Sequence, residues 1–204
     1  FQRAESDIYF LTILIFIILT IFLSIGPSLD IYISNLFYNG QNFKLQSLDL
    51  ITIATRKFFL YFVIFYILVF PLFSRYSTIQ KIYFGFKFNL KEGLFISFSF
   101  IINLVLVVNL LLKNLWGRAR PNDIVELGGQ DLFTPWYEFS KACETNCSFV
   151  SGDTSVGFSL IVFYLLTKNK IFFWLALISG FFIGVIRIME GGHFFSDVFL
   201  SGFL

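Results

Sequence analysis

Residues 94–112 read LFISFSFIINLVLVVNLLL, which is close to the length of about 20 apolar residues that crosses a bilayer as a helix. Five further apolar runs lie along the chain, and the shorter ones need flanking residues to span: Ile8–Ile25, Phe58–Phe73, Val156–Leu166, Ile171–Ile186 and Phe194 to the end. Of the 204 residues, 57% are hydrophobic and 14% are charged, unlike a soluble domain. The sequence therefore predicts one all-α domain over residues 1–204, a polytopic membrane bundle of six transmembrane helices.

The chain opens without Met and stops inside an apolar run, so we expect both termini to be trimmed. A signal peptide is an alternative for Ile8–Ile25, but Glu5 and Asp7 lie in its flank and no small-residue cleavage site follows. We therefore interpret this run as a membrane anchor.

The basic residues of the connecting loops predict the orientation in the membrane. Seven would lie on one side, namely Arg3, Arg75, Lys81, Lys87, Lys91, Lys168 and Lys170, and four non-motif bases on the other, namely Lys44, Arg56, Lys57 and Lys141. Because cytoplasmic loops carry an excess of Lys and Arg, the first side is expected to be cytoplasmic. The basic segment Arg75–Lys91 then suits anionic lipid rather than nucleic acid. No protein partner can be inferred.

A cluster of cations follows residues 94–112. The sequence continues Lys113-Asn114-Leu115-Trp116-Gly117-Arg118-Ala119-Arg120-Pro121. Simple anchoring of the helix end at the interface, with Trp116 as the aromatic residue, is one interpretation. The other is an anion site, because Lys113 and Arg120 lie seven positions apart and would share a helical face.

The longest polar stretch, Asn122–Asn146, separates this cluster from the fourth apolar run and is long enough to cover a site. It contains Cys143, and Cys147 follows it. In an oxidising compartment we favour a disulfide between them over free thiols. A metal site is not expected, because two cysteines and one distant histidine leave ligands missing.

The fourth apolar run opens with Ser151-Gly152-Asp153. Small residues with a hydroxyl group at a helix start expose backbone N–H groups, which bind phosphate-like anions. An ordinary Ser or Asp N-cap is the alternative for the same residues.

His193 is the only histidine of the chain, and Asp197 follows four residues later. If the segment is helical from His193 on, the two side chains share a face, which is a geometry for a nucleophile and the group that orients it. A lone histidine among apolar residues is more often structural. Arg187, six residues upstream, favours the functional interpretation.

Together, Lys113-x6-Arg120-Pro121, then Ser151-Gly152-Asp153, then Arg187-x5-His193-x3-Asp197 resemble the three-part signature of the type 2 phosphatidic acid phosphatase superfamily. The resemblance implies that Lys113, Arg120 and Arg187 bind phosphate and that Ser151 and Gly152 form an anion-cradling loop. It further implies that His193 is the nucleophile and Asp197 its orienter, without a metal or another cofactor. Arg118 and Trp116 are possible secondary contacts.

Within the superfamily, the motifs look most like those of bacterial lipid A 4′-phosphatases, and the early Leu29-Asp30-Ile31 fits the same branch. The resemblance implies removal of a phosphate monoester from a lipid headgroup through a phosphohistidine. The enzyme would lie in the bacterial inner membrane, with its active site at the outer membrane–water interface, facing the periplasm. Undecaprenyl pyrophosphate and phosphatidic acid phosphatases are alternatives.

The sequence departs from the family pattern at Asp153, where the usual residue is a histidine that protonates the leaving group. We expect Asp153 to take over as proton donor, and the alternative is a helix cap or an arginine partner. Because of this departure, a further alternative is that the protein is a non-catalytic relative that only binds phospholipid. A transporter is the remaining class, but the ionisable groups cluster beside one interface rather than at mid-helix.

Overall fold

The computed structural model describes residues 13–15, 17–21, 24, 26–45, 50–65, 72 and 89–204. These residues are organised as helices and loops, and their only β-structure is two isolated bridges, which confirms the all-helical prediction for the described part. The first apolar run contributes helical residues at 13–15, 17–21 and 24. Several bases used for the orientation, including Arg3, Arg75, Lys81 and Lys87, lie outside the described residues.

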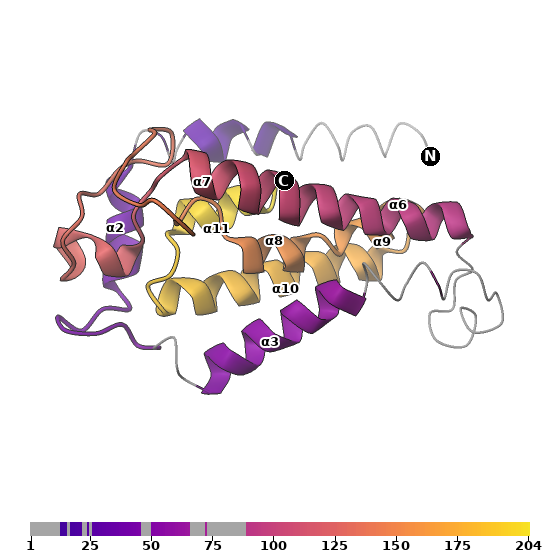
Figure 1. Ribbon diagram of the computed structural model, residues 1–204, viewed down its shortest axis with the longest axis horizontal. Helices are drawn as coiled ribbons and strands as arrows, with labels where there is room; N and C mark the ends of the chain where they lie inside the picture. The colour runs from indigo at the N-terminus through magenta and orange to yellow at the C-terminus, as the bar shows by residue number, and fades with distance from the viewer. Residues whose placement is uncertain are drawn as a thin grey trace.

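Two long helices run along the long axis of the molecule, and α6–α7 extends beyond α10 on the right (Figure 1). The first is continuous over Leu90–Leu115 and consists of α6 (Leu90–Phe100), the π-helix η2 (Ile101–Leu112) and α7 (Lys113–Leu115). The second is α10 (Lys170–Met189). Within the described ranges, these two helices are long and apolar enough to cross a membrane, and the full set of six spans stays a prediction.

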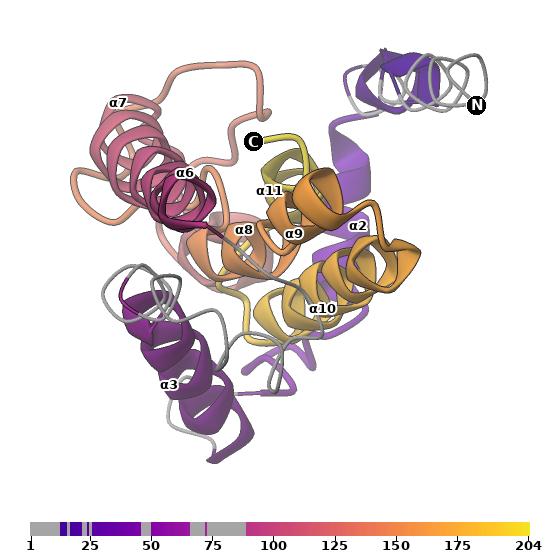
Figure 2. The same ribbon diagram turned by 90° about the vertical axis from the view of Figure 1, so that its right-hand side faces the viewer.

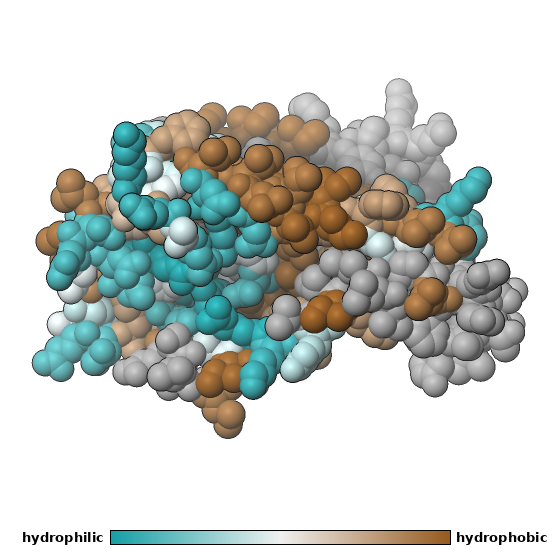
Figure 3. All heavy atoms as spheres, in the orientation of Figure 1, coloured by the Kyte–Doolittle hydropathy of each residue, from teal (hydrophilic) through white to brown (hydrophobic). Residues whose placement is uncertain are grey.

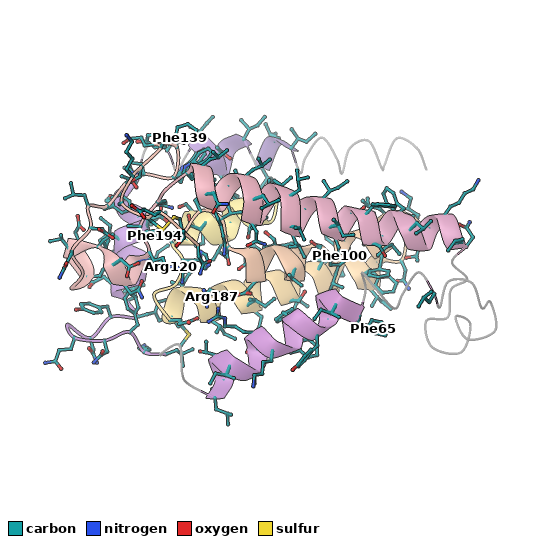
Figure 4. The ribbon with its side chains drawn as sticks, in the orientation of Figure 1. Phe65, Phe100, Arg120, Phe139, Arg187 and Phe194 are labelled. Carbon is teal, nitrogen blue, oxygen red and sulfur yellow. A yellow bond between two sulfur atoms is a disulfide. The ribbon has the colours of Figure 1, made fainter. Side chains whose placement is uncertain are left out.

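Helices α8 (Gly152–Phe158) and α9 (Ile161–Thr167) lie between α6–α7 on one side and α10 on the other (Figure 2). Glycines allow this close packing, because a Cβ atom at Gly157 would lie 2.8 Å from the backbone of Gly180 on α10. The buried residues Ile96, Phe100, Leu104, Val156 and Ile183 form the core of the bundle. Phe100 marks its middle in Figure 4.

Helix α3 spans Leu50–Ile64 and packs against α8. It begins at Leu50 and not at Phe58, where the expected apolar run started. The additional residues, Leu50–Ala54, are mostly apolar and extend the helix toward the polar end of the molecule. Arg56 was expected among the bases of the connecting loops. It lies on α3 instead.

The remaining short elements collect at one end of the bundle, on the left of Figure 1. They are α2 (Ser28–Asn35), the 3₁₀ helices η3 (Pro121–Asp123) and η4 (Val125–Leu127), and α11 (Phe195–Ser201). They share a small core of Phe43, Ala119, Ile124, Leu127 and Phe194. The surface of this end is largely hydrophilic, and the hydrophilic area continues toward the middle of the bundle (Figure 3).

Candidate active site

A cavity of about 230 Å³ lies between α3, η2, α8 and α10. Four cationic side chains line it, those of Arg56, Lys113, Arg120 and Arg187. Its other lining residues include Asn146, Gly152 and Asp153 at the polar end, and Phe59, Leu104, Val105 and Val156 toward the middle of the bundle. Figure 4 shows Arg120 and Arg187 close to each other at the polar end. The cavity is therefore cationic at one end and apolar at the other, and we refer to it as the cation cavity.

Lys113 and Arg120 converge as predicted, but not because they share a helical face. The helix ends at Leu115, and the chain turns at Gly117, where φ is +63° and a Cβ atom would lie 1.9 Å from the carbonyl oxygen of Ser140. Arg120 then returns in extended conformation. The tight glycine turn, and not helical periodicity, brings the two cations together.

Asn146 connects these two cations, and sequence reasoning missed it. Lys113 Nζ donates to Asn146 Oδ1 at 3.0 Å, and Arg120 Nη2 donates to the carbonyl oxygen of Asn146 at 2.7 Å. Cys143 and Cys147 form the expected disulfide, and Asn146 lies inside that loop with φ of +53°. The two oxygens of Asn146 accept from donors that would otherwise be available to a phosphate group.

Arg187 is buried, with 3% of its side chain exposed. Its Nη1 forms an ion pair and hydrogen bond with Glu190, and its Nε lies 3.3 Å from Asp153 Oδ2. Glu190 was not predicted as a site residue. Its spacing of three residues from Arg187 at a helix end could have indicated an ion pair. A Cβ atom at Gly192 would lie 2.8 Å from Arg187 Nη2, so this glycine lets the guanidinium approach the chain next to His193.

Asp153 contacts two arginines, with Arg187 at 3.3 Å and Arg56 at 4.0 Å. The N-cap of α8 is Ser151, whose hydroxyl group accepts from the backbone N–H of Thr154 at 3.4 Å. Of the interpretations open for Asp153, the arginine partner is thus present and the N-cap is not. Ser151 is buried and engaged as the cap, whereas Gly152 lines the cavity beside Lys113.

His193 is 1% exposed, and its Nδ1 forms a 2.6 Å hydrogen bond with the backbone carbonyl of Ser148. Because a carbonyl oxygen only accepts, Nδ1 carries the proton, and Nε2 keeps the free lone pair that a nucleophile needs. The ring is therefore oriented by the backbone that precedes α8.

The direct hydrogen bond expected between His193 and Asp197 is not formed, since Nδ1 and Oδ2 lie 3.9 Å apart. Helix α11 begins at Phe195, after His193, so the two residues do not share a helical face. The Asp197 carboxylate instead accepts from the backbone N–H of Phe194 at 2.9 Å and from the Ser148 hydroxyl at 2.5 Å. Asp197 and His193 thus both bond to Ser148, Asp197 to its hydroxyl group and His193 to its carbonyl. The expected direct hydrogen bond is corrected, and the role of Asp197 in orienting His193 stays a prediction.

The electrostatics of the site keep His193 neutral. Burial lowers the pKa of the imidazole well below its ordinary value, and the positive charges of Arg187, Lys113 and Arg120 lower it further. Both causes disfavour the charged ring. His193 therefore holds its nucleophilic form at neutral pH.

Arg118 lies away from the cation cavity, as the centre of a buried network. Its guanidinium contacts Asp30 at 2.8 Å and Asp197 at 2.6 Å, and it also donates to Ser196 Oγ and to the carbonyl of Thr134. The two carboxylates outweigh the burial and raise the pKa of Arg118. The expected secondary phosphate contact is therefore corrected: Arg118 fixes Asp197 and joins α2 to α11.

Trp116, the other possible secondary contact, also has a structural environment. Its indole Nε1 donates to the carbonyl of Trp136 at 2.6 Å, and its ring stacks on Phe149 with centroids 4.5 Å apart. It does not line the cation cavity. Its position anchors the long loop to the end of α7.

The arrangement of a buried neutral imidazole beside several cations defines a class of protein, and comparison with known families identifies it. The PAP2 superfamily model matches residues 93–204, and the chain belongs to this superfamily of phosphatases. It is 36% identical over 189 residues to the lipid A 4′-phosphatase of Francisella tularensis subsp. novicida (strain U112), covering 89% of this chain and 83% of that protein.

A second relative, the lipid A 4′-phosphatase of Rhizobium leguminosarum, is 28% identical over 195 residues, covering 86% of this chain and 82% of that protein. No solved structure matches the chain. The superfamily match begins at Gly93, so Asp30 and Arg56, which reach the network and the cavity from α2 and α3, lie outside it.

Proposed function

We propose that this protein removes the 4′-phosphate of lipid A through a phosphohistidine formed on His193. The observation that carries the proposal is a cavity lined by four cations, three of which, Lys113, Arg120 and Arg187, are close enough to His193 to lower the pKa of its buried imidazole. The imidazole does not line the cavity itself, and its Nδ1 donates to the carbonyl of Ser148. The similarity to lipid A 4′-phosphatases supports the choice of lipid. The apolar part of the same cavity, formed by Phe59, Leu104 and Val105, suits a substrate that carries acyl chains.

The cations supply the electrostatic part of the catalysis. A phosphate monoester brings about two negative charges, which persist into the transition state and must be neutralised by positioned donors. Lys113 and Arg120 would exchange the oxygens of Asn146 for phosphate oxygens. Arg187, fixed between Asp153 and Glu190, would hold a third position around the phosphorus atom.

The covalent steps follow from the tautomer of His193. Its Nε2 forms a bond to phosphorus as the ester P–O bond breaks, and the leaving sugar oxygen takes up a proton. We propose Asp153, which lines the cavity, as the donor of that proton. Water then attacks phosphorus and gives a proton to the Asp153 carboxylate as the N–P bond breaks. This releases phosphate and restores both the imidazole and the protonated Asp153.

The proposal includes the site's position in the cell. Six membrane-spanning helices would hold the polar end of the bundle at the periplasmic face of the inner membrane. The loop-base asymmetry supports this orientation, and the concentration of hydrophilic surface at the site end (Figure 3) supports placing that end at the membrane–water interface.

The decisive experiment offers purified protein lipid A, a pyrophosphate lipid and phosphatidic acid in parallel and measures released phosphate. We expect lipid A to be the preferred substrate, with acid-labile, base-stable phosphate on the protein during turnover. A preference for either other lipid would reject lipid A as the substrate. Binding of all three lipids without phosphate release would instead identify a non-catalytic relative.

A further inference from the structure

A second cavity, of about 440 Å³, adjoins the cation cavity of about 230 Å³ and shares Arg56 and Arg120 with it. It is within the size range of small-molecule sites and nearly twice as large as the cavity proposed for the phosphate. Most of its lining side chains carry oxygen or nitrogen: Tyr38, Gln41, Asn42, Asn122 and Glu190. We refer to it as the polar cavity.

One wall of the polar cavity is the segment that follows α2, and this wall is fixed by hydrogen bonds. Asn39 Oδ1 accepts from the backbone N–H groups of Gln41 and Asn42, at 3.0 and 2.8 Å. The N–H of Leu45 donates to the carbonyl of Met189 at 3.1 Å and ties the segment to the end of α10. The turn thus holds Gln41 and Asn42 in the lining of the polar cavity, together with Glu190 and Gly192.

The opposite wall comes from the loop after Arg120. The N–H of Asn122 donates to the carbonyl of Gly191 at 3.1 Å, and Tyr38 crosses to this loop, where its hydroxyl oxygen would lie 2.4 Å from a Cβ atom at Gly128. Gly128 has φ of +87°, so the conformation and the contact both require glycine. The two walls are therefore in direct contact.

The chemistry of the walls indicates the type of ligand. Amide side chains both donate and accept hydrogen bonds, and those of Gln41, Asn42 and Asn122 are on exposed residues of the cavity wall, where they are accessible to a ligand. Apart from Arg56 and Arg120, which this cavity shares with the smaller one, the charged side chain among its described lining residues is Glu190, so the part of the lining away from the two arginines does not favour a second anion. An acyl chain is also disfavoured, because the lining is predominantly polar. A neutral ring rich in hydroxyl and amide groups fits best.

We propose that the polar cavity is the subsite for the sugar ring that carries the phosphate, so that it determines specificity for a phosphorylated carbohydrate lipid. The inference rests on the proposed function and adds to it the residues that recognise the headgroup. Arg56 and Arg120, at the boundary of the two cavities, place the phosphate ester between them. Glu190 contacts Arg187 and lines the polar cavity, which links the sugar to a phosphate ligand.

The test compares two lipids that differ only in the headgroup, a diacylated glucosamine 4-phosphate and a phosphatidic acid with the same acyl chains. The readout is the ratio of their kcat/KM values in mixed micelles, which cancels losses of folded protein. We expect Asn42→Ala and Asn122→Ala each to lower the ratio about tenfold, the usual effect of one lost hydrogen bond. Gln130→Ala removes an exposed amide from the same loop outside the cavity and should leave the ratio at the wild-type value.

Binding of the headgroup alone provides an independent measurement. Water-soluble glucosamine 4-phosphate should inhibit hydrolysis of p-nitrophenyl phosphate at lower concentration than inorganic phosphate does, and the two variants should lose this difference. If wild-type protein hydrolyses the sugar lipid but the variants keep the wild-type ratio and inhibition, the subsite is overturned and the proposed function stands. If wild-type protein releases phosphate from neither lipid, the proposed function fails as well.

Discussion

At the scale of single residues, His193 is both the proposed nucleophile and the only histidine of the sequence. Its imidazole NMR signals can therefore be followed through a pH titration without residue assignment. Because burial and then the nearby cations lower its pKa, we expect the ring to stay neutral well below the pH at which an ordinary histidine protonates. ¹⁵N NMR of histidine-labelled protein measures this directly. Arg187→Gln removes one positive charge and should raise the pKa, whereas a wild-type pKa at or above the ordinary value would contradict the electrostatic argument.

The roles of His193 and Asp197 separate by mutation. His193→Ala should remove essentially all turnover, because its imidazole is the nitrogen nucleophile of the site that is neutral and also a good leaving group for the second step. Ser148→Ala deletes the hydroxyl bonded to Asp197 but keeps the carbonyl bonded to His193. It should therefore lower kcat only about tenfold, the effect of one hydrogen bond.

Both variants should affect formation of the phosphohistidine, and the rate of enzyme phosphorylation in a single turnover measures this step directly. Substantial activity in His193→Ala would end the nucleophile assignment. A complete loss in Ser148→Ala would show that the backbone carbonyl alone does not position the ring.

Asp153 lines the cavity and also contacts Arg187, so a role as proton donor and a role as arginine partner predict different mutant phenotypes. As proton donor it would matter for a poor leaving group. Asp153→Asn should then slow hydrolysis of the sugar phosphate by about 10²–10⁴-fold but that of p-nitrophenyl phosphate much less. Equal losses on both substrates would instead identify Asp153 as the partner that holds Arg187. Both rates must be measured where phosphorylation of the enzyme is limiting.

At the scale of elements, the sequence predicts the apolar helices better than their ends. Runs of apolar residues suffice to locate α6–η2, α8–α9 and α10, because burial and span length are encoded locally. The face arguments for Lys113 with Arg120 and for His193 with Asp197 failed because each assumed a helix where the chain turns or has not yet become helical. Such boundaries depend on tertiary contacts, for example the close approach of Gly117 to Ser140.

The residues that sequence reasoning missed came to the site from distant elements. Arg56 stands on α3 and Asn146 in the disulfide loop, and nothing in their local sequence indicates that they meet Arg120. Asp30 was noted only as part of a family-like segment, yet it contacts Ser196, 166 positions away. Contacts of this range follow from the packing of α2 on α11 and not from a local pattern.

The packing of α2 on α11 provides a stability test. Asp30 is 3% exposed and pairs with the fully buried Arg118, and removing one partner of a buried ion pair costs about 3–5 kcal/mol. We expect Asp30→Asn to lower the free energy of unfolding in detergent micelles by about 3 kcal/mol, and to reduce activity because Arg118 also holds Asp197. Glu126→Gln changes an exposed acid at the same end and should stay within about 0.5 kcal/mol of wild type. Equal stability of the two variants would show that the network does not hold α2 in place.

At the scale of the whole molecule, charge and apolar surface are separated along the long axis. The cations of the site line one cavity, and Arg120 and Arg187 lie toward one end of the two long helices (Figure 4). Exposed apolar side chains such as Phe98, Ile102 and Phe182 lie along these helices. A lipid with its chains between the helices would present its headgroup at the level of the site. This separation explains how one cavity can be lined by arginines at one end and by phenylalanine and leucine at the other.

The orientation of this axis in the membrane is the last prediction. If the loop bases set the topology, the end that carries the site faces outward, and the turn between α9 and α10 faces the cytoplasm. Lys141 and Lys170 are exposed residues near these two ends, and both native cysteines are bonded to each other, so a single introduced thiol can be read cleanly. In intact spheroplasts, a membrane-impermeant thiol reagent should label Lys141→Cys, whereas Lys170→Cys should react only after the membrane is permeabilised. The reverse pattern would place the cation cavity on the cytoplasmic side, where it would meet a substrate on the opposite face of the membrane from the one proposed.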